Sequence, residues 1–335
     1  MSEIKQIVKA EIHSHLELCL RPATIKELAP QFGIELPNEQ TFRDRFIIDE
    51  PMKDLGSVLN KFLDTQKLLA SEEILERITY EACEDAYKIS NTKILELRYA
   101  PTFVQQGHEN LNFEKIHAAI VKGMKKAEAD FDMAVGLICI IQRILPVKEA
   151  EAVTDFAIDH KETFVGLDLA DNEVGFDSKP FAPFFLRAKK AGLGITVHSG
   201  EADVPKAPRY VQDAIEYLGA DRIGHGVQIY RDEKMMSYVK EKQIPLELCP
   251  TSNWLTSAIS TKEAHPFKQL YDFGIMTTIN TDDGGIFDVN LNQEYELLHR
   301  LHGLDRSDLE HCADYAAKVS FISPEKKQKV WPRKL

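Results

Sequence analysis

Histidines and carboxylates lie at the ends of several short apolar runs in this sequence. His13 and His15 end the first run, His198 lies near the end of the fifth, and Asp282 and Asp283 end the eighth. Residues i and i+2 of a strand point to the same face, so the first two imidazoles can converge on one metal ion. Three histidines and a carboxylate suit a catalytic zinc, which keeps a further position open for water.

Two more ionisable residues stand at such ends. Glu201 follows His198 in HSGE, and His225 lies between two glycines in the sixth run. They leave a carboxyl group and an imidazole for proton transfer. A lone H-x-H pair is a weak signal, since strand-end histidines also bond to backbone carbonyls. The grouping of histidine and acid at strand ends favours the zinc site.

The remaining histidines lie outside the expected strand ends. His265 precedes Pro266 and is interpreted as structural. Those in loops or helical stretches are interpreted as surface or packing residues: His108, His117, His160, His299, His302 and His311.

The apolar runs predict the elements that position these groups. Rich in Val, Ile, Leu and Thr, they are typical of buried parallel strands. They cover 9–15, 94–101, 133–141, 164–170, 194–201, 222–227, 245–253 and 276–283, and helical spacing follows at 113–130, 148–160, 181–191 and 232–242. Eight strands with helical crossovers predict an α/β fold, the (β/α)₈ TIM barrel, whose active site lies at the C-terminal strand ends. The alternative, an open doubly wound sheet, would need an early Gly-rich phosphate loop, which is absent.

The whole chain, 1–335, is predicted to be one barrel domain. The interval 16–93 exceeds one helix and is interpreted as a helical lid insertion over the barrel mouth. Within it, Leu55, Val58, Leu59 and Phe62 have the spacing of one apolar helix face. The tail, 305–335, is expected to form helices that close the other side.

Composition excludes several classes of partner. Lys and Arg number 41 against 53 Asp and Glu, a net charge of −12, which argues against nucleic acid and anionic membranes as partners. No apolar stretch is long enough for a membrane span, and the N-terminus does not read as a signal peptide. The five cysteines include no C-x-x-C pair, which favours a cytoplasmic location. A small-molecule ligand is expected, and the oligomeric state is left open.

Five motifs in order resemble the adenosine deaminase family of zinc hydrolases. They are HSHLE at 13–17, TVHSGE at 196–201, RIGHGV at 222–227, LCPTSNW at 248–254 and NTDD at 280–283. The resemblance covers nearly the whole chain. It implies a (β/α)₈ barrel with one zinc ion per chain. It also implies hydrolytic loss of ammonia from a 6-aminopurine nucleoside, adenosine or 2′-deoxyadenosine.

The resemblance also implies residue roles. The zinc ligands would be His13, His15, His198 and Asp282. His225 would contact the metal-bound water and either accept its proton or stabilise the hydroxide. Glu201 would protonate purine N1, which requires a carboxyl kept protonated by burial. Asp283 would hydrogen-bond N7, either charged or sharing a proton.

Three departures from the family pattern concern the substrate. Glu17 followed by Leu18 replaces the usual Asp-Gly that meets the ribose, and its extra methylene moves the carboxylate by about 1.5 Å. Asp171 replaces a glycine whose amide usually meets purine N3, an acceptor that an ionised carboxylate would repel. Gly284 and Gly285 replace the usual proline, which is expected to loosen the loop that carries Asp283. A lower activity on adenosine, or a shifted substrate, is therefore expected.

Other functions remain as alternatives. Free adenine or a modified adenosine is the main alternative substrate. AMP is disfavoured because Lys53, Lys61 and Lys67 form no compact cluster and are typical of a solvated helix face. A two-metal hydrolase of this kind would need a lysine at the end of the fourth strand. The fourth run, FVGLDLA, contains none. A non-catalytic nucleoside-binding relative would have lost a ligand or the proton donor. The base-editing zinc deaminases carry H-x-E and P-C-x-x-C, which this chain lacks.

Overall fold

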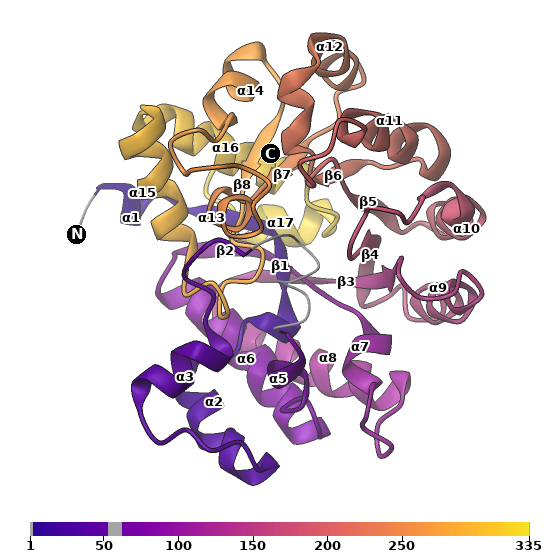
Figure 1. Cartoon of the computed structure of the whole chain (residues 1–335), viewed down its shortest axis with the longest axis vertical. Helices are drawn as coiled ribbons and strands as arrows, with labels where there is room; N and C mark the ends of the chain where they lie inside the picture. The colour runs from indigo at the N-terminus through magenta and orange to yellow at the C-terminus, as the bar shows by residue number, and fades with distance from the viewer. Residues whose placement is uncertain (1–2, 53–61, 335) are drawn as a thin grey trace.

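Eight parallel strands alternate with helices along the chain and pair in chain order, β1 to β8 (Figure 1). The computed structural model describes residues 3–52 and 62–334. The strands are β1 (Lys9–His15), β2 (Thr92–Tyr99), β3 (Ala134–Gln142), β4 (Phe164–Ala170), β5 (Gly194–Ser199), β6 (Arg222–His225), β7 (Leu246–Leu248) and β8 (Thr277–Ile279). The predicted TIM barrel is confirmed.

The helices form a ring outside the strands, with additions at the two ends of the chain (Figure 1). They are α1 (Glu3–Gln6), α2 (Pro22–Leu28), α3 (Glu39–Phe46), α5 (Leu63–Gln66), α6 (Glu72–Lys88), α7 (Pro101–Gln105), α8 (Phe113–Asp130), α9 (Glu149–Asp159), α10 (Ala182–Ala191), α11 (Ala207–Leu218), α12 (Glu233–Glu241), α13 (Pro250–Leu255), α14 (Phe267–Phe273), α15 (Leu291–His302), α16 (Arg306–Val319) and α17 (Pro324–Val330). Helix α8 has the predicted boundaries, because Asn112 caps it by accepting the N–H of Lys115.

The last two strands are shorter than predicted. The seventh run, 245–253, holds only β7, because Pro250 at its helix-compatible φ begins α13. The eighth run, 276–283, holds β8 and then a turn in which Asp282 has φ +65°. Both segments thus leave the sheet earlier than predicted.

The barrel closes between β8 and β1 through a few specific bonds. The N–H of Asp282 donates to the carbonyl of His13 at 3.0 Å, and the N–H of His15 donates back to Asp282 at 2.9 Å. Below them, the side-chain oxygen of Asn280 accepts the N–H of Ile12 at 3.0 Å. The seam therefore holds three of the predicted metal ligands at fixed backbone positions.

Phe321, which follows α16, packs against the opposite end of the strands. A Cβ at Gly194 would lie 2.3 Å from this ring, so only glycine permits the approach. The Arg222 guanidinium lies over the other part of the ring, 3.7 Å from its centroid. This end is packed shut, and the site faces the other end.

The interval 16–93 contains α2, α3, α5 and α6. Helix α6 packs along α8 and beside β2, so it belongs to the ring, whereas α2 and α3 lie outside it (Figure 1). Residues 53–61 lie outside the described residues, and with them Leu55, Val58, Leu59, Lys53 and Lys61 of the predicted lid. The lid stays a prediction.

Two further predictions can be compared with the described residues. Lys67 pairs with Asp64 at 2.8 Å on the surface, in agreement with a solvated helix face. None of the helices in residues 3–52 and 62–334 is long and apolar enough to cross a membrane. The cytoplasmic location stays a prediction.

Candidate functional site

Four of the predicted residues meet at the C-terminal ends of the strands. His13, His15, His198 and Asp282 each offer one donor atom, and these atoms all lie within 4.8 Å of one another. Nε2 of His15 lies 3.2 Å from Nε2 of His198, and Nε2 of His13 lies 3.1 Å from Oδ1 of Asp282. Imidazole nitrogens that face one another around a carboxylate match the His and Asp donors that zinc prefers. The donor set therefore fits a zinc ion.

A second group of donors shares Asp282 and adds His225 and Cys249. Burial raises the pKa of the Cys249 thiol well above its ordinary value. A protonated thiol is a poor metal ligand, because the thiolate is the binding form. The set with three histidines is therefore the better metal site.

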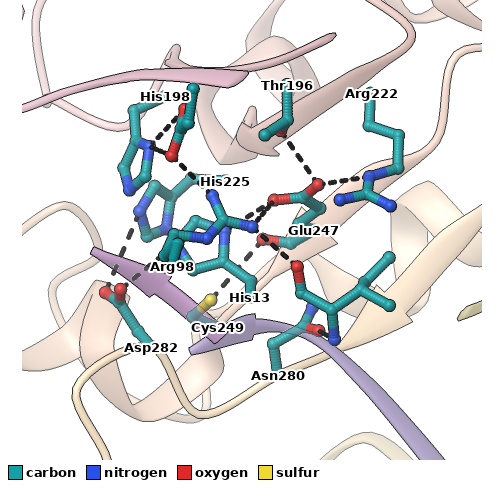
Figure 2. A network of polar contacts seen from close by, with 12 residues as sticks. His13, Arg98, Thr196, His198, Arg222, His225, Glu247, Cys249, Asn280 and Asp282 are labelled. Carbon is teal, nitrogen blue, oxygen red and sulfur yellow. Dashed lines mark hydrogen bonds and ion pairs between the residues drawn. The ribbon is translucent and has the colours of Figure 1, made fainter. Parts of the chain in front are cut away.

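Carboxylates behind the ligands orient two of the imidazoles (Figure 2). Nδ1 of His13 lies 2.7 Å from Glu247, and Nδ1 of His198 lies 3.0 Å from Asp168. An imidazole that donates its Nδ1–H to a carboxylate keeps a lone pair on Nε2 for a metal. Both rings are thus held in the tautomer and orientation that metal binding requires.

These carboxylates belong to a fully buried ion network (Figure 2). Arg98 contacts both Asp168 and Glu247 at 2.8 Å, and Arg222 joins Glu247 at 2.6 Å to Glu96 at 2.7 Å. Burial raises the pKa of Glu247, but the charges of the two guanidinium groups outweigh it and hold this pKa well below its usual range. The Glu247 carboxylate therefore stays ionised between the two guanidinium groups beneath the ligands.

Glu201 lies on the turn after β5, with its carboxyl inside the site. The Thr256 hydroxyl donates to Oε1 at 3.0 Å, and Oε2 lies 3.6 Å from Nε2 of His225. Burial and then the negative charge of Asp282 raise the pKa of Glu201 to about 7. A protonated carboxyl is thus available near neutral pH, as expected of a proton donor.

The Glu201 turn is held by a residue to which sequence reasoning assigned no role. The buried carboxylate of Glu173 accepts three successive N–H groups: those of Gly200 at 2.8 Å, Glu201 at 2.9 Å and Ala202 at 2.7 Å. Successive N–H groups that point to one side form a concavity for an anion. Glu173 fills it and fixes the backbone that carries Glu201.

Replacing Glu173 with Gln is expected to lower kcat by about tenfold or more, because a displacement near 1 Å in a catalytic group costs up to about 10²-fold. The amide nitrogen cannot accept an N–H, so at least one bond to the turn is lost. Steady-state kinetics would measure the loss. Glu128→Gln is the matched control, since Glu128 accepts the N–H of Val135 away from the site. An unchanged kcat in the Glu173 variant would show that the turn holds without it.

A cavity of about 490 Å³ opens above the ligands, a volume typical of small-molecule sites. Its described lining includes Glu17, Asp171, Glu201 and Asp283 but no Lys or Arg. Large apolar side chains line it as well, namely Leu18, Phe62, Leu63, Phe103, Ile140 and Ile144, together with the polar side chains of Gln106, Gln142, Asn172 and Thr256. The described wall therefore combines carboxyl groups with large apolar and uncharged polar side chains, which suits a neutral or cationic ring compound.

Asp283 lies in this wall next to the ligand Asp282. Its Oδ1 is buried without a hydrogen-bond partner among the described residues. Burial, and next the charge of Asp282, raise the pKa of Asp283 well above its usual value. Both effects favour the protonated carboxyl, the form that can donate to a ring nitrogen.

The first two departures from the family pattern lie in the cavity wall. Glu17 accepts the N–H of Ala100 at 2.5 Å, and its buried Oε2 has no partner among the described residues. Burial raises the pKa of Glu17 to about 7. Asp171 adopts φ +82°, in the region that favours glycine, and its carboxylate accepts the Asn172 N–H at 2.8 Å and the Gln142 amide at 3.2 Å. Its carboxylate is thus tied to the wall.

The third departure, Gly284 and Gly285, does not loosen the loop as expected. The loop after Asp283 is fastened: the N–H groups of Gly285 and Ile286 donate to the carbonyl of Leu18 at 2.8 and 3.2 Å. A Cβ at Gly285 would lie 2.6 Å from that oxygen, so glycine allows the two backbones to touch. Instead of loosening the loop, this glycine lets it dock.

The structure thus brings all the predicted site residues together. Eight line the cavity, and His13 lies buried behind them. Sequence reasoning gave no part to Asp168, Glu247, Arg98 or Glu173. A charged residue inside an apolar strand run was the available signal for the first three of these, and Glu173 lies two residues after Asp171 in the segment compared with the family.

The chain matches known sequences over almost its entire length. The sequence model of the family described as "Adenosine deaminase" matches residues 8–333. The adenosine deaminase of Shigella flexneri serotype 5b is 35% identical over 322 residues, covering 95% of each chain. The adenosine deaminase of Plasmodium knowlesi is 33% identical over 330 residues, covering 97% of this chain and 90% of that one.

Solved structures with the same fold include deaminases of different substrates. The adenine deaminase of Arthrobacter aurescens has a TM-score of 0.87 at 26% identity, with 96% of each chain covered. A zinc-bound amidohydrolase of Burkholderia ambifaria has the same TM-score and identity over 97% of this chain and 88% of that one. The N6-methyl-AMP deaminase of Arabidopsis thaliana has a TM-score of 0.82 at 29% identity, with 98% and 96% covered.

Proposed function

Since the chain belongs to the adenosine deaminase family and is a hydrolase of C–N bonds, we propose that it deaminates adenosine or 2′-deoxyadenosine. One water and one 6-aminopurine nucleoside would give one 6-oxopurine nucleoside and one ammonia. The observation that carries the proposal is that Glu201 and Asp283 line one cavity together with His15, His198 and Asp282, three of the four converging ligand residues. A metal-assisted hydrolysis needs these three parts together.

His13, His15, His198 and Asp282 would hold one zinc ion per chain. Zinc in such a site lowers the pKa of a bound water from 15.7 to about 7, which supplies a nucleophile at neutral pH. Glu201 would donate its proton to purine N1, so that C6 becomes a better electrophile. Asp283 would donate to N7 and fix the ring plane. His225 would contact the attacking oxygen through Nε2, which faces Glu201 and Asp282.

The charge of the cavity supports a nucleoside over a nucleotide. Its described wall carries Glu17 and Asp171 and no cation that could pair a phosphate. A phosphate would therefore meet carboxylates without compensation. Protein sites that recognise phosphate usually supply Arg or Lys. A neutral ribose avoids this cost and offers hydroxyl groups to the same carboxylates.

Free adenine is the second candidate. Glu17 has one oxygen committed to the Ala100 N–H and one without a partner among the described residues. That oxygen would accept a ribose hydroxyl or the N9–H that only the free base carries. The similarity to the adenine deaminase of Arthrobacter aurescens favours this candidate.

A side-by-side substrate comparison tests the proposal. Loss of absorbance in the adenine band would be followed with adenosine, 2′-deoxyadenosine, adenine, AMP and N6-methyl-AMP on the zinc-loaded protein. We expect the nucleosides to exceed both nucleotides in kcat/KM by about 10²-fold or more, since an unpaired phosphate among carboxylates costs several kcal/mol. Faster turnover of adenine would replace the proposed substrate and leave the reaction in place. Faster turnover of either nucleotide would contradict the charge argument, and no turnover of any would contradict the function.

A further inference from the structure

A chain of hydrogen bonds reaches His225 from behind the site. The backbone N–H of Phe267 donates to Nδ1 of His265 at 3.1 Å. Nε2 of His265 lies 3.1 Å from Oδ1 of Asn253, and Nδ2 of Asn253 lies 3.1 Å from Nδ1 of His225. Both imidazoles and the amide are at least 97% buried, so water does not compete for these positions.

The direction of each hydrogen bond in this chain follows from the one that the Phe267 N–H donates. A backbone N–H is always a donor, so Nδ1 of His265 is an acceptor and carries no proton. The ring proton of His265 is therefore on Nε2 and is donated to the Asn253 oxygen. The Asn253 amide nitrogen then faces His225 and donates to its Nδ1. His225 consequently carries its proton on Nε2, the nitrogen that faces the site.

The opposite orientation of the Asn253 amide is excluded by the same matching of donors to acceptors. If Asn253 were turned over, its NH₂ group would face Nε2 of His265. Both nitrogens of that ring would then meet donors, which requires an imidazole without any proton. A doubly protonated His225 is excluded as well, because its Nδ1–H would meet the Asn253 donor. The network thus permits one arrangement.

We infer that His265 and Asn253 are positioning residues that hold His225 as the neutral Nε2–H tautomer. In this form His225 donates a hydrogen bond to the attacking oxygen and cannot remove a proton from it. Its Nε2 lies 3.6 Å from Glu201 and 3.9 Å from Asp282, and the carboxylate of Asp282 is an acceptor, as an N–H requires. The inference rests on the proposed function and decides between the two roles expected for His225. It also replaces the interpretation of His265 as only structural.

The tautomer can be measured directly on the zinc-loaded protein. Long-range ¹H–¹⁵N correlation spectra of ¹⁵N-histidine-labelled protein distinguish a protonated ring nitrogen from an unprotonated one. The His225 signals would be identified by their loss in the His225→Gln variant. We expect Nε2 to be protonated and Nδ1 unprotonated. A proton on Nδ1 in the wild type would overturn the inference, whatever the activity of the protein.

Asn253→Asp reverses the direction of the hydrogen bond to His225 with almost no change in the shape of the side chain. A carboxylate only accepts, so His225 would have to donate from Nδ1 and would lose the fixed Nε2–H. A serine protease whose buried Asp is changed to Asn, the reverse exchange, holds its histidine in the wrong tautomer and loses about 10⁴-fold in kcat. We expect Asn253→Asp to lower kcat by about 10²–10⁴-fold, with KM changed less than about threefold and the zinc retained.

A role of His225 as proton acceptor predicts the opposite effect of Asn253→Asp on kcat. If His225 removed a proton, Asn253→Asp would hold it in the useful tautomer and preserve or raise kcat, and that outcome would overturn the inference. Asn292→Asp is the matched control, because Asn292 is buried on α15 and donates to the carbonyl of Ile89 away from the cavity. It should lower stability without changing kcat. A wild-type protein inactive on every purine would contradict the proposed function while leaving the tautomer measurement valid.

Discussion

Replacing Glu201 with Gln is expected to lower kcat by about 10²–10⁴-fold, the range that a positioned general acid contributes. Gln keeps the shape of the side chain and the hydrogen bond from Thr256, but it has no acidic proton for purine N1. Because the proton is needed in the transition state, kcat and kcat/KM should fall together. Steady-state kinetics and metal analysis of the same preparation would measure the change.

The metal content separates this effect from loss of the site. Glu201 is not among the four converging ligands, so the variant should bind as much zinc as the wild type. Glu216→Gln, the same exchange on the exposed face of α11, serves as the control. Turnover within a factor of two of the wild type would remove Glu201 from the mechanism.

The pH dependence of the wild type should show the same carboxyl. With a pKa of about 7, Glu201 is protonated below that pH and ionised above it. Since only the protonated form donates, kcat/KM should decline as the pH rises through about 7, and this decline should be absent from the residual activity of the Gln variant.

The largest loss of stability is expected from Arg98→Met, about 3–5 kcal/mol in the free energy of unfolding. Arg98 is fully buried and joins Asp168 to Glu247, and the methionine would leave both carboxylates without this partner. Removing one member of a buried ion pair exposes the desolvation cost of the others. Urea denaturation of both proteins at the same pH would measure it.

A surface exchange gives the comparison for Arg98. Arg306 pairs with Glu310 one turn away on the exposed side of α16, and its change to Met should alter stability by less than about 1 kcal/mol. The Arg98 variant should also lose zinc affinity, since Asp168 and Glu247 orient His198 and His13. If Arg98→Met were as mild as Arg306→Met, the network would not be the support proposed for the ligands.

Local spacing accounts for what was predicted correctly. His13 and His15 are two residues apart on one strand, and such neighbours share a face wherever the strand lies. The site residues at the end of β6 and in the turns after β5 and β8 follow in the same way, because parallel barrel strands end at one mouth. The lengths of β7 and β8 were overestimated, since an apolar run does not reveal where the sheet bonding stops.

Contacts between residues far apart in the sequence could be identified only from the tertiary structure. His13 meets Glu247 across 234 positions, and Asn253 meets His225 across 28, with no periodicity that links either pair. Sequence alone indicated the groups that line the cavity and the candidate metal ligands, because barrel topology places the strand ends at one mouth, but it did not indicate the residues that support them. The tertiary structure decided which buried contacts shift the pKa of these groups and which hydrogen bonds support the inferred tautomer of His225. Proton positions depend on which donor or acceptor packs against each atom, and that packing is set only when remote parts of the chain come together.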